Sequence, residues 1–351
     1  MSQHYNVAGL DLTDADASSK IHRVLLAAMQ QQLERSPLAP HCLLNDFSAA
    51  SALSLNGIAL EEGVGLPGRS PYRPYNASSE QTSGSSATSY REPYWDASHF
   101  GLDRVAVFHT ATPAEQRAIL YRANLALLQE AYAIEKAGMG YMSRMALLAE
   151  TTQERMLYTL FAADETSHFV QLSPFVHEKP TLANNPFLQL LSEVLEGADK
   201  TVLLFVIQVV LEGWGLTHYR ALAKDCRSVP LQLTLQGFLQ DESRHHGTGV
   251  TLFNQAQMSP ESHAGIVEIL MQFLRMVQAG PQSVVEAIAH VKGHLSQEQK
   301  VQILAELDTE THSGTRLQTL RSLMRGDGAG EIVQELDDRG AFRPLPAHQC
   351  V

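Results

Sequence analysis

The segments ADETSH (163–168) and QDESRHH (240–246) decide how this sequence is interpreted. Each contains the pattern Glu-x-x-His, first at Glu165 and His168 and again at Glu242 and His245. Residues three apart on an α-helix lie on the same face, so each pair directs a carboxylate and an imidazole to one point. A single Glu-x-x-His is common by chance and is weak evidence for a metal site.

Each pattern also has a partner glutamate at the same distance upstream. Glu135 lies 30 residues before Glu165, and Glu212 lies 30 residues before Glu242. The midpoint of each interval falls at a predicted turn, so the two glutamates of a pair lie at equal heights in a helical hairpin. Two such hairpins packed together bring four carboxylates and two imidazoles into one layer.

Helix-start signals support this division into hairpins. Thr112 and Glu115 form a capping box with Pro113 at the first helical position, and Thr151 and Glu154 have the same spacing. Helices are expected at about 113–149, 151–174, 186–225 with a break near residue 197, 229–258, from 260 onward, and near 281–292, 297–309 and 314–325. Because strand-type alternation is nearly absent, the predicted fold class is all-α, with a four-helix bundle at its centre.

Three regions are expected along the chain. Residues 1–111 form an N-terminal extension, with a helix over 19–35 and a stretch rich in Ser, Gly and Pro over 63–95. That stretch has the composition of a surface loop, and a lid facing the substrate is the alternative. Residues 112–258 form the bundle, and residues 259–351 form a C-terminal helical extension.

An apolar bundle cannot hold four unpaired carboxylates, because burying even one ionised group is costly. A dinuclear metal site resolves the problem, since two helices supply a glutamate and two supply Glu-x-x-His. The four glutamates are the candidate catalytic residues, and the expected metal ligands are Glu135, Glu165, His168, Glu212, Glu242 and His245. Carboxylate and imidazole ligands suit both iron and manganese.

Three further acidic residues bear on this site. Asp164 and Asp241 directly precede the two Glu-x-x-His glutamates. They either accept a hydrogen bond from the second ring N–H of a metal-bound histidine or are solvated, and both readings stay open. Glu130 is the rival of Glu135, because glutamates five residues apart cannot both face one metal pair. The symmetric spacing favours Glu135.

Over residues 112–258 the two motifs resemble those of the ferritin-like non-haem di-iron carboxylate superfamily, which includes soluble di-iron oxygenases, acyl-carrier-protein desaturases and arylamine N-oxygenases. The resemblance implies two iron ions, with manganese as an option, held by the six residues named above. It implies an enzyme that uses O₂ to hydroxylate, desaturate or N-oxygenate a small organic or carrier-bound substrate. An electron donor or reductase is then an expected partner.

Two members of that superfamily match less closely. Leu172 occupies the position of the radical tyrosine in ribonucleotide reductase small subunits, and Phe238 occupies that of the extra histidine ligand of arylamine N-oxygenases. The alternative function is a di-manganese catalase or peroxidase, or an iron-storage protein. Roughly 110 residues before the bundle and 90 after it favour an enzyme with a substrate pocket.

Composition excludes some other classes of protein. The net charge of −12 and the lack of a dense Lys or Arg run argue against nucleic-acid binding. The cysteines, Cys42, Cys226 and Cys350, are far apart and indicate a reducing compartment. The longest apolar stretch, 202–211, is half the roughly 20 residues that a membrane span needs. We therefore expect a cytoplasmic protein with no membrane span, and a homodimer is compatible with the sequence.

Overall fold

The computed structural model describes residues 20, 21, 23, 24, 92–178, 185–324, 326 and 328–351. Within these ranges every regular element is a helix and none is a strand, so the all-α prediction is confirmed. Of the helix expected over 19–35, the four described residues are helical, and the rest lies outside the described residues. The stretch 63–95 lies outside them as well, except for its last four residues.

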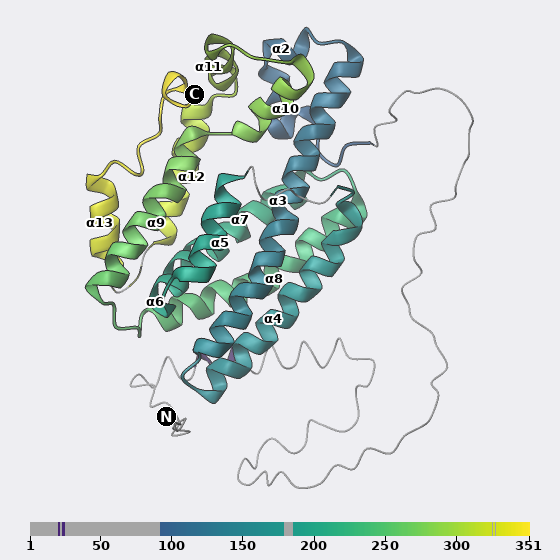
Figure 1. The fold of residues 1–351 in the computed structure, drawn as a ribbon. Coiled ribbons are helices and arrows are strands. Elements are labelled where there is room, and N and C mark those ends of the chain that lie inside the picture. The colour runs from purple at the N-terminus through teal and green to yellow at the C-terminus, as the bar shows by residue number, and fades with distance from the viewer. Residues whose placement is uncertain (1–19, 22, 25–91, 179–184, 325, 327) are drawn as a thin grey trace, which may run out of the picture. The chain divides into compact units, whose positions relative to one another are not determined.

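Four long helices carry the residues that the sequence singles out: α3 (Pro113–Leu148), α4 (Thr152–Leu172), α7 (Glu212–Asp225) and α8 (Val229–Phe253). Helix α3 packs against α4, α7 packs against α8, and α4 packs across α8 (Figure 1). The two helical hairpins therefore form as predicted, with turns at residues 149–151 and 226–228.

Local side-chain chemistry sets where these helices begin. Thr112 accepts a hydrogen bond from the backbone N–H of Glu115, whose carboxylate accepts one from the N–H of Thr112, which completes the predicted capping box. Thr151 accepts from the N–H of Glu154, but the Glu154 carboxylate turns to the N–H of Glu150 instead, so the second box is only half formed. These caps satisfy N–H groups that a helix leaves unpaired at its start.

The segment between the hairpins is broken as expected near residue 197 but contains an element that the sequence did not predict. Helix α5 (Pro186–Gly197) is followed by the single turn α6 (Lys200–Leu203), and a π-helix, η5 (Leu204–Leu211), then leads directly into α7. In a π-helix each N–H bonds to a carbonyl five residues earlier, and such segments often occur at functional sites.

The continuous helical stretch Lys200–Asp225 is long and apolar enough to pass a compositional test for a membrane span. More than half of its apolar window, 56%, is buried inside the protein. The central helix of a packed core meets the same test, so this feature is weak evidence for a membrane span.

The C-terminal part adds α9 (Pro260–Ala279), α10 (Gln282–Lys292), α11 (Gln297–Glu306), α12 (Thr309–Leu323) and α13 (Gly330–Asp338). Helix α12 begins five residues before its predicted start, and α13 was not predicted. Short single turns complete the order: η1 (Ala97–Phe100), η2 (Leu102–Arg104), α2 (Ala106–His109), η3 (Ser173–Phe175) and η6 (Ala347–Gln349).

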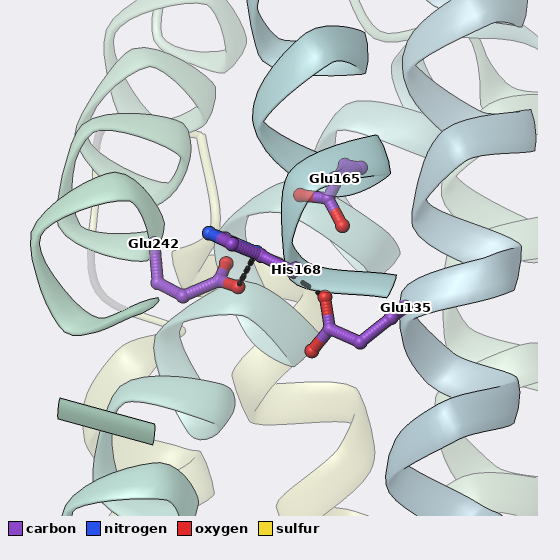
Figure 2. Close-up of side chains that lie close together, drawn as sticks. All are labelled: Glu135, Glu165, His168 and Glu242. Carbon is purple, nitrogen blue, oxygen red and sulfur yellow. Dashed lines mark ion pairs between the residues drawn. The ribbon is translucent and has the colours of Figure 1, made fainter. Parts of the chain in front are cut away.

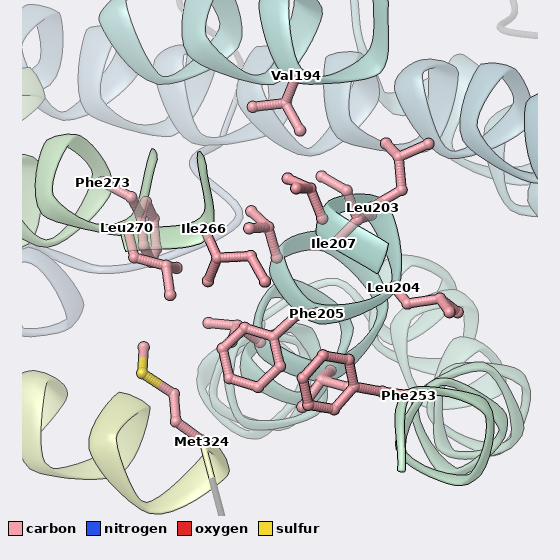
Figure 3. Close-up of a cluster of buried hydrophobic side chains, with 14 of the residues drawn as sticks. Val194, Leu203, Leu204, Phe205, Ile207, Phe253, Ile266, Leu270, Phe273 and Met324 are labelled. Atoms are coloured by element: carbon pink, nitrogen blue, oxygen red, sulfur yellow. The ribbon is translucent and has the colours of Figure 1, made fainter. Parts of the chain in front are cut away.

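The largest apolar core joins the π-helix to these C-terminal helices. Phe205 in η5 packs with Phe253 in α8, and Ile266 and Leu270 in α9 belong to the same buried cluster (Figure 3). All described residues fall in one compact unit. The π-helix is therefore held between the core on one side and the α8 helix on the other.

Candidate metal centre

One layer of side chains is formed by residues of the four long helices, from within α3, α4 and α8 and from the start of α7. We call it the Glu/His cluster, and its members are Glu135, Glu165, His168, Glu212, Glu242 and His245. Figure 2 shows four of them converging from α3, α4 and α8. The structure thus brings together all six residues that the sequence proposed as metal ligands.

The first half of the Glu/His cluster is centred on one imidazole nitrogen. His168 Nδ1 lies 3.2 Å from Glu135 Oε2 and 3.4 Å from Glu242 Oε1 (Figure 2). Together with Glu165 these residues place one ligand atom each within 4.8 Å of one another, a group that can hold a metal ion.

The second half repeats this arrangement around the other imidazole. His245 Nδ1 lies 3.0 Å from Glu165 Oε1, 3.4 Å from Glu242 Oε2 and 4.0 Å from Glu212 Oε2. These four residues form a second group that can hold a metal ion. The two groups share Glu165 and Glu242, and a carboxylate with two oxygens can contact two cations at once. The two candidate groups therefore overlap at these two carboxylates.

Unsatisfied polar atoms test whether cations fit here. Buried atoms without a hydrogen-bond partner include Glu135 Oε2, Glu165 Oε1, His168 Nδ1 and His245 Nδ1. These are the same atoms that face one another across the layer. Buried polar atoms are nearly always paired, so such a concentration needs an explanation. Cations placed among them would satisfy all four, and the donor set fits iron or manganese.

The pKa shifts within the Glu/His cluster are also consistent with a cation site. Burial, followed by the charge of Glu242, raises the pKa of Glu165 to about 7 and raises that of Glu212 well above its ordinary value. Burial would lower the pKa of His168, but the hydrogen bond to Asp241 and the nearby carboxylates of Glu135 and Glu242 outweigh it and raise the pKa. Without cations the site thus retains protons, which metal binding would release.

The two aspartates hold the outer nitrogens of the imidazoles. His168 Nε2 lies 3.1 Å from Asp241 Oδ2, and His245 Nε2 lies 3.5 Å from Asp164 Oδ2. The pairing is crossed, because each aspartate serves the histidine of the other hairpin. The Asp241 acceptor at His168 Nε2 leaves the Nδ1 lone pair of that ring directed inward, as a metal ligand requires, whereas Asp164 lies near His245 Nε2 without a hydrogen bond to it.

Arg244 links these two aspartates. Its guanidinium donates to Asp241 and, at 3.3 Å, to Asp164. Its side chain is largely buried, so the positive charge offsets two carboxylates in a poorly solvated place. Arg244 was not predicted as part of the site, although its position one helical turn after Asp241 on α8 is a visible signal.

Two other features shape the inner layer. The buried Tyr219 hydroxyl donates to Glu135 Oε1, which leaves Oε2 for the cation position. Tyr219 lies two helical turns after Glu212 on the same face, which the sequence analysis also passed over. A Cβ at Gly138 would lie 2.2 Å from Glu165 Oε2, so the glycine makes room for that carboxylate.

Several candidates lie outside the layer. Glu130 accepts a hydrogen bond from Asn185 at 3.4 Å and belongs to neither metal-holding group, in keeping with the preference for Glu135. His246 packs its ring against Gly213 rather than facing the site. Tyr141 donates to Gln208 instead of lining the layer.

Solvent reaches the Glu/His cluster unevenly. The Glu212 side chain is 12% exposed, whereas the side chains of the other five members are at most 5% exposed. Glu212 is therefore the member of the cluster that is most accessible to solvent. Comparison of the chain with protein-family models, curated proteins and solved structures found no match.

Proposed function

We propose that this protein is an O₂-dependent oxidoreductase that holds two iron ions in the Glu/His cluster and oxidises a small organic or carrier-bound substrate. The observation that carries the proposal is that the two metal-holding groups share Glu165 and Glu242. We further propose that α3, α4, α7 and α8 form a ferritin-like bundle. A pair of iron ions held there would supply the electrons that reduce O₂.

The residues of the chain prepare this chemistry. Glu165 and Glu242 would contribute to holding both ions, whereas Glu135 with His168 and Glu212 with His245 would each contribute to holding one. Asp241 accepts from His168 Nε2 and so fixes the tautomer of that ring, and Asp164 places a negative charge 3.5 Å from His245 Nε2. The aromatic rings of Phe161 against His245 and Phe238 against His168 exclude water from the inner layer. The more exposed side at Glu212 is the route by which we expect O₂ and substrate to arrive.

The proposed reaction has consequences for partners and location. Inserting one oxygen atom into a C–H or N–H bond and releasing the other as water consumes two electrons and two protons from outside. A reductase partner is therefore part of the proposal. A cytoplasmic location is proposed because Cys226 and Cys350 are both free thiols, which suits a reducing compartment.

The test is reconstitution with Fe(II) under anaerobic conditions, followed by exposure to O₂. We expect two irons per chain and O₂ uptake that depends on them. Glu135→Gln should lose iron and uptake, whereas Glu130→Gln, five residues away on the same helix, should keep both. Iron binding without O₂ uptake would contradict the oxidoreductase. Preferential tight binding of manganese with peroxide breakdown would replace it with the catalase alternative.

A further inference from the structure

A buried hydrogen-bonded group lies next to the Glu/His cluster without belonging to it. Gln208 is fully buried, and so are Tyr141 and Tyr158. Gln208 Oε1 accepts from Tyr141 Oη at 2.8 Å and from Tyr158 Oη at 2.7 Å, and its Nε2 donates to the backbone oxygen of His245 at 2.7 Å. One amide side chain thus connects α3, α4, η5 and α8.

The orientation of this amide follows from its partners. A backbone carbonyl can only accept, so the nitrogen of Gln208 must face His245 and the oxygen must face the two hydroxyls. Burial raises the pKa of both Tyr141 and Tyr158 well above the ordinary value, so both phenols keep their protons and donate. Both lone pairs of the Gln208 oxygen are therefore used.

Gln208 lies at the centre of the π-helix that ends where Glu212 begins. The backbone N–H of Glu212 donates to the carbonyl of Ile207, five residues earlier, as the π geometry requires. A change from four-residue to five-residue hydrogen bonding inserts one residue, which turns everything after it by about 100° around the helix axis. The direction of Glu212 thus depends on the π-helix being kept.

Helix α8 leaves space for Gln208 of η5 at Gly249. A Cβ at Gly249 of α8 would lie 2.6 Å from Gln208 Cγ and 3.0 Å from its backbone carbon. Glycine is therefore required for η5 and α8 to approach this closely. Because a buried amide without partners is costly, the three hydrogen bonds of Gln208 favour this one register of η5 over an ordinary α-helix.

We propose that Gln208, held by Tyr141 and Tyr158, is a positioning residue that sets Glu212 and His245 for the second cation of the Glu/His cluster. The inference rests on the proposed function of that cluster as a two-cation site. Gln208 donates a hydrogen bond to the backbone oxygen of His245 and lies one helical turn before Glu212, and both of these residues belong to the second group. The Gln208 side-chain hydrogen bonds go to Tyr141, Tyr158 and the backbone of His245, none of which belongs to the first group, so its loss should weaken one cation selectively.

The experiment is a titration of the full chain with Co(II), followed by calorimetry and by the visible absorption of the bound cobalt. Wild type should bind two ions. Gln208→Met keeps the bulk but removes the hydrogen bonds, and the second ion should bind at least about tenfold more weakly while the first binds within about twofold of wild type. Glu212→Gln should show the same one-ion pattern and serves as the reference.

The matched control is Gln278→Met. Gln278 is also a buried glutamine whose amide donates to two backbone oxygens, those of Gly340 and Arg343, but it lies in α9 away from the Glu/His cluster. The Gln278→Met variant should bind both ions with wild-type affinity and show an unchanged cobalt spectrum. Equal weakening in the two glutamine variants would indicate general destabilisation and would overturn the positioning role.

A second variant keeps the test decisive if Gln208→Met does not fold. The double variant Tyr141→Phe, Tyr158→Phe removes only two hydroxyls and should weaken the second ion by a smaller factor, again without affecting the first. If the folded variants bind both ions with wild-type affinity, the positioning role of Gln208 is wrong, but the two-cation site is not contradicted. Failure of the wild-type chain to bind cobalt would overturn the two-cation site and this inference with it.

Discussion

At the scale of single residues, the neighbours of Glu165 and Glu135 leave room for one carboxylate and form a hydrogen bond to the other. Gly138 lies where a side chain would collide with Glu165, and Tyr219 occupies the one Glu135 oxygen that does not face the cation position. The spacing in the sequence predicted which glutamates and histidines meet. It did not reveal Tyr219 or Arg244, because a tyrosine or arginine at helical spacing is equally common in ordinary packing.

A glycine pair on α3 tests this matching. Gly138→Ala places a Cβ 2.2 Å from Glu165 Oε2 and must displace that carboxylate, so cation affinity should fall by about tenfold or more. Gly140→Ala meets nothing within 4 Å and should keep the affinity, with a helix gain of up to about 1 kcal/mol. Calorimetric titration and thermal unfolding of both variants check this. Similar affinities in the two would show that Gly138 makes no room for a ligand.

At the scale of helices, the matched 30-residue intervals were enough to predict two hairpins and the height at which their glutamates meet. The π-helix could not be predicted in the same way. A π-helix is an inserted residue compensated by tertiary contacts, here those of Gln208 and Gly249, and its residues Leu204–Leu211 have no composition that distinguishes them from a buried α-helix. The crossed pairing, in which an aspartate of one hairpin lies beside a histidine of the other, could not be predicted from the sequence either. Residue spacing within one hairpin gives no information about its contacts with the second hairpin.

The crossed pairing has a direct test. Asp241→Asn removes the charged acceptor at His168 Nε2, which relaxes the tautomer and orientation of that ring. Cation affinity should fall by about 10–100-fold. Asp337→Asn removes a carboxylate that pairs with Arg321 at the surface and should leave affinity unchanged. If Asp241→Asn binds cations as wild type does, the aspartate is not a partner of a metal-bound histidine.

At the scale of the whole molecule, the all-α class followed from periodicity and capping signals, and the C-terminal helices close the core around η5. Helix α13 escaped prediction because its start, Ala329, provides no capping side chain. Without cations, bringing these six ionisable groups together, five of them buried, lowers the stability of the fold, and the packing of the surrounding helices must offset this. Cations should therefore stabilise the fold, and by an amount that depends on pH.

The sign of that dependence follows from the pKa shifts. In the metal-free protein Glu165 keeps its proton up to about pH 7, whereas an ordinary glutamate loses it near pH 4.5, so its stabilising contribution is lost as pH rises through 7. The raised pKa of His168 acts in the same direction. A cation needs deprotonated ligands and binds better as pH rises. The rise in Tm caused by Mn(II) should therefore grow from pH 6 to pH 8 in calorimetry, and a rise that shrinks over this range would contradict it.

The central claim is that two cations lie between the shared carboxylates of Glu165 and Glu242. Crystals of the protein loaded with Fe(II) under anaerobic conditions, measured across the iron absorption edge, test it most directly. The account predicts two anomalous peaks inside the Glu/His cluster, about 3.5–4 Å apart. One peak or none within that layer, in fully loaded crystals, would contradict it.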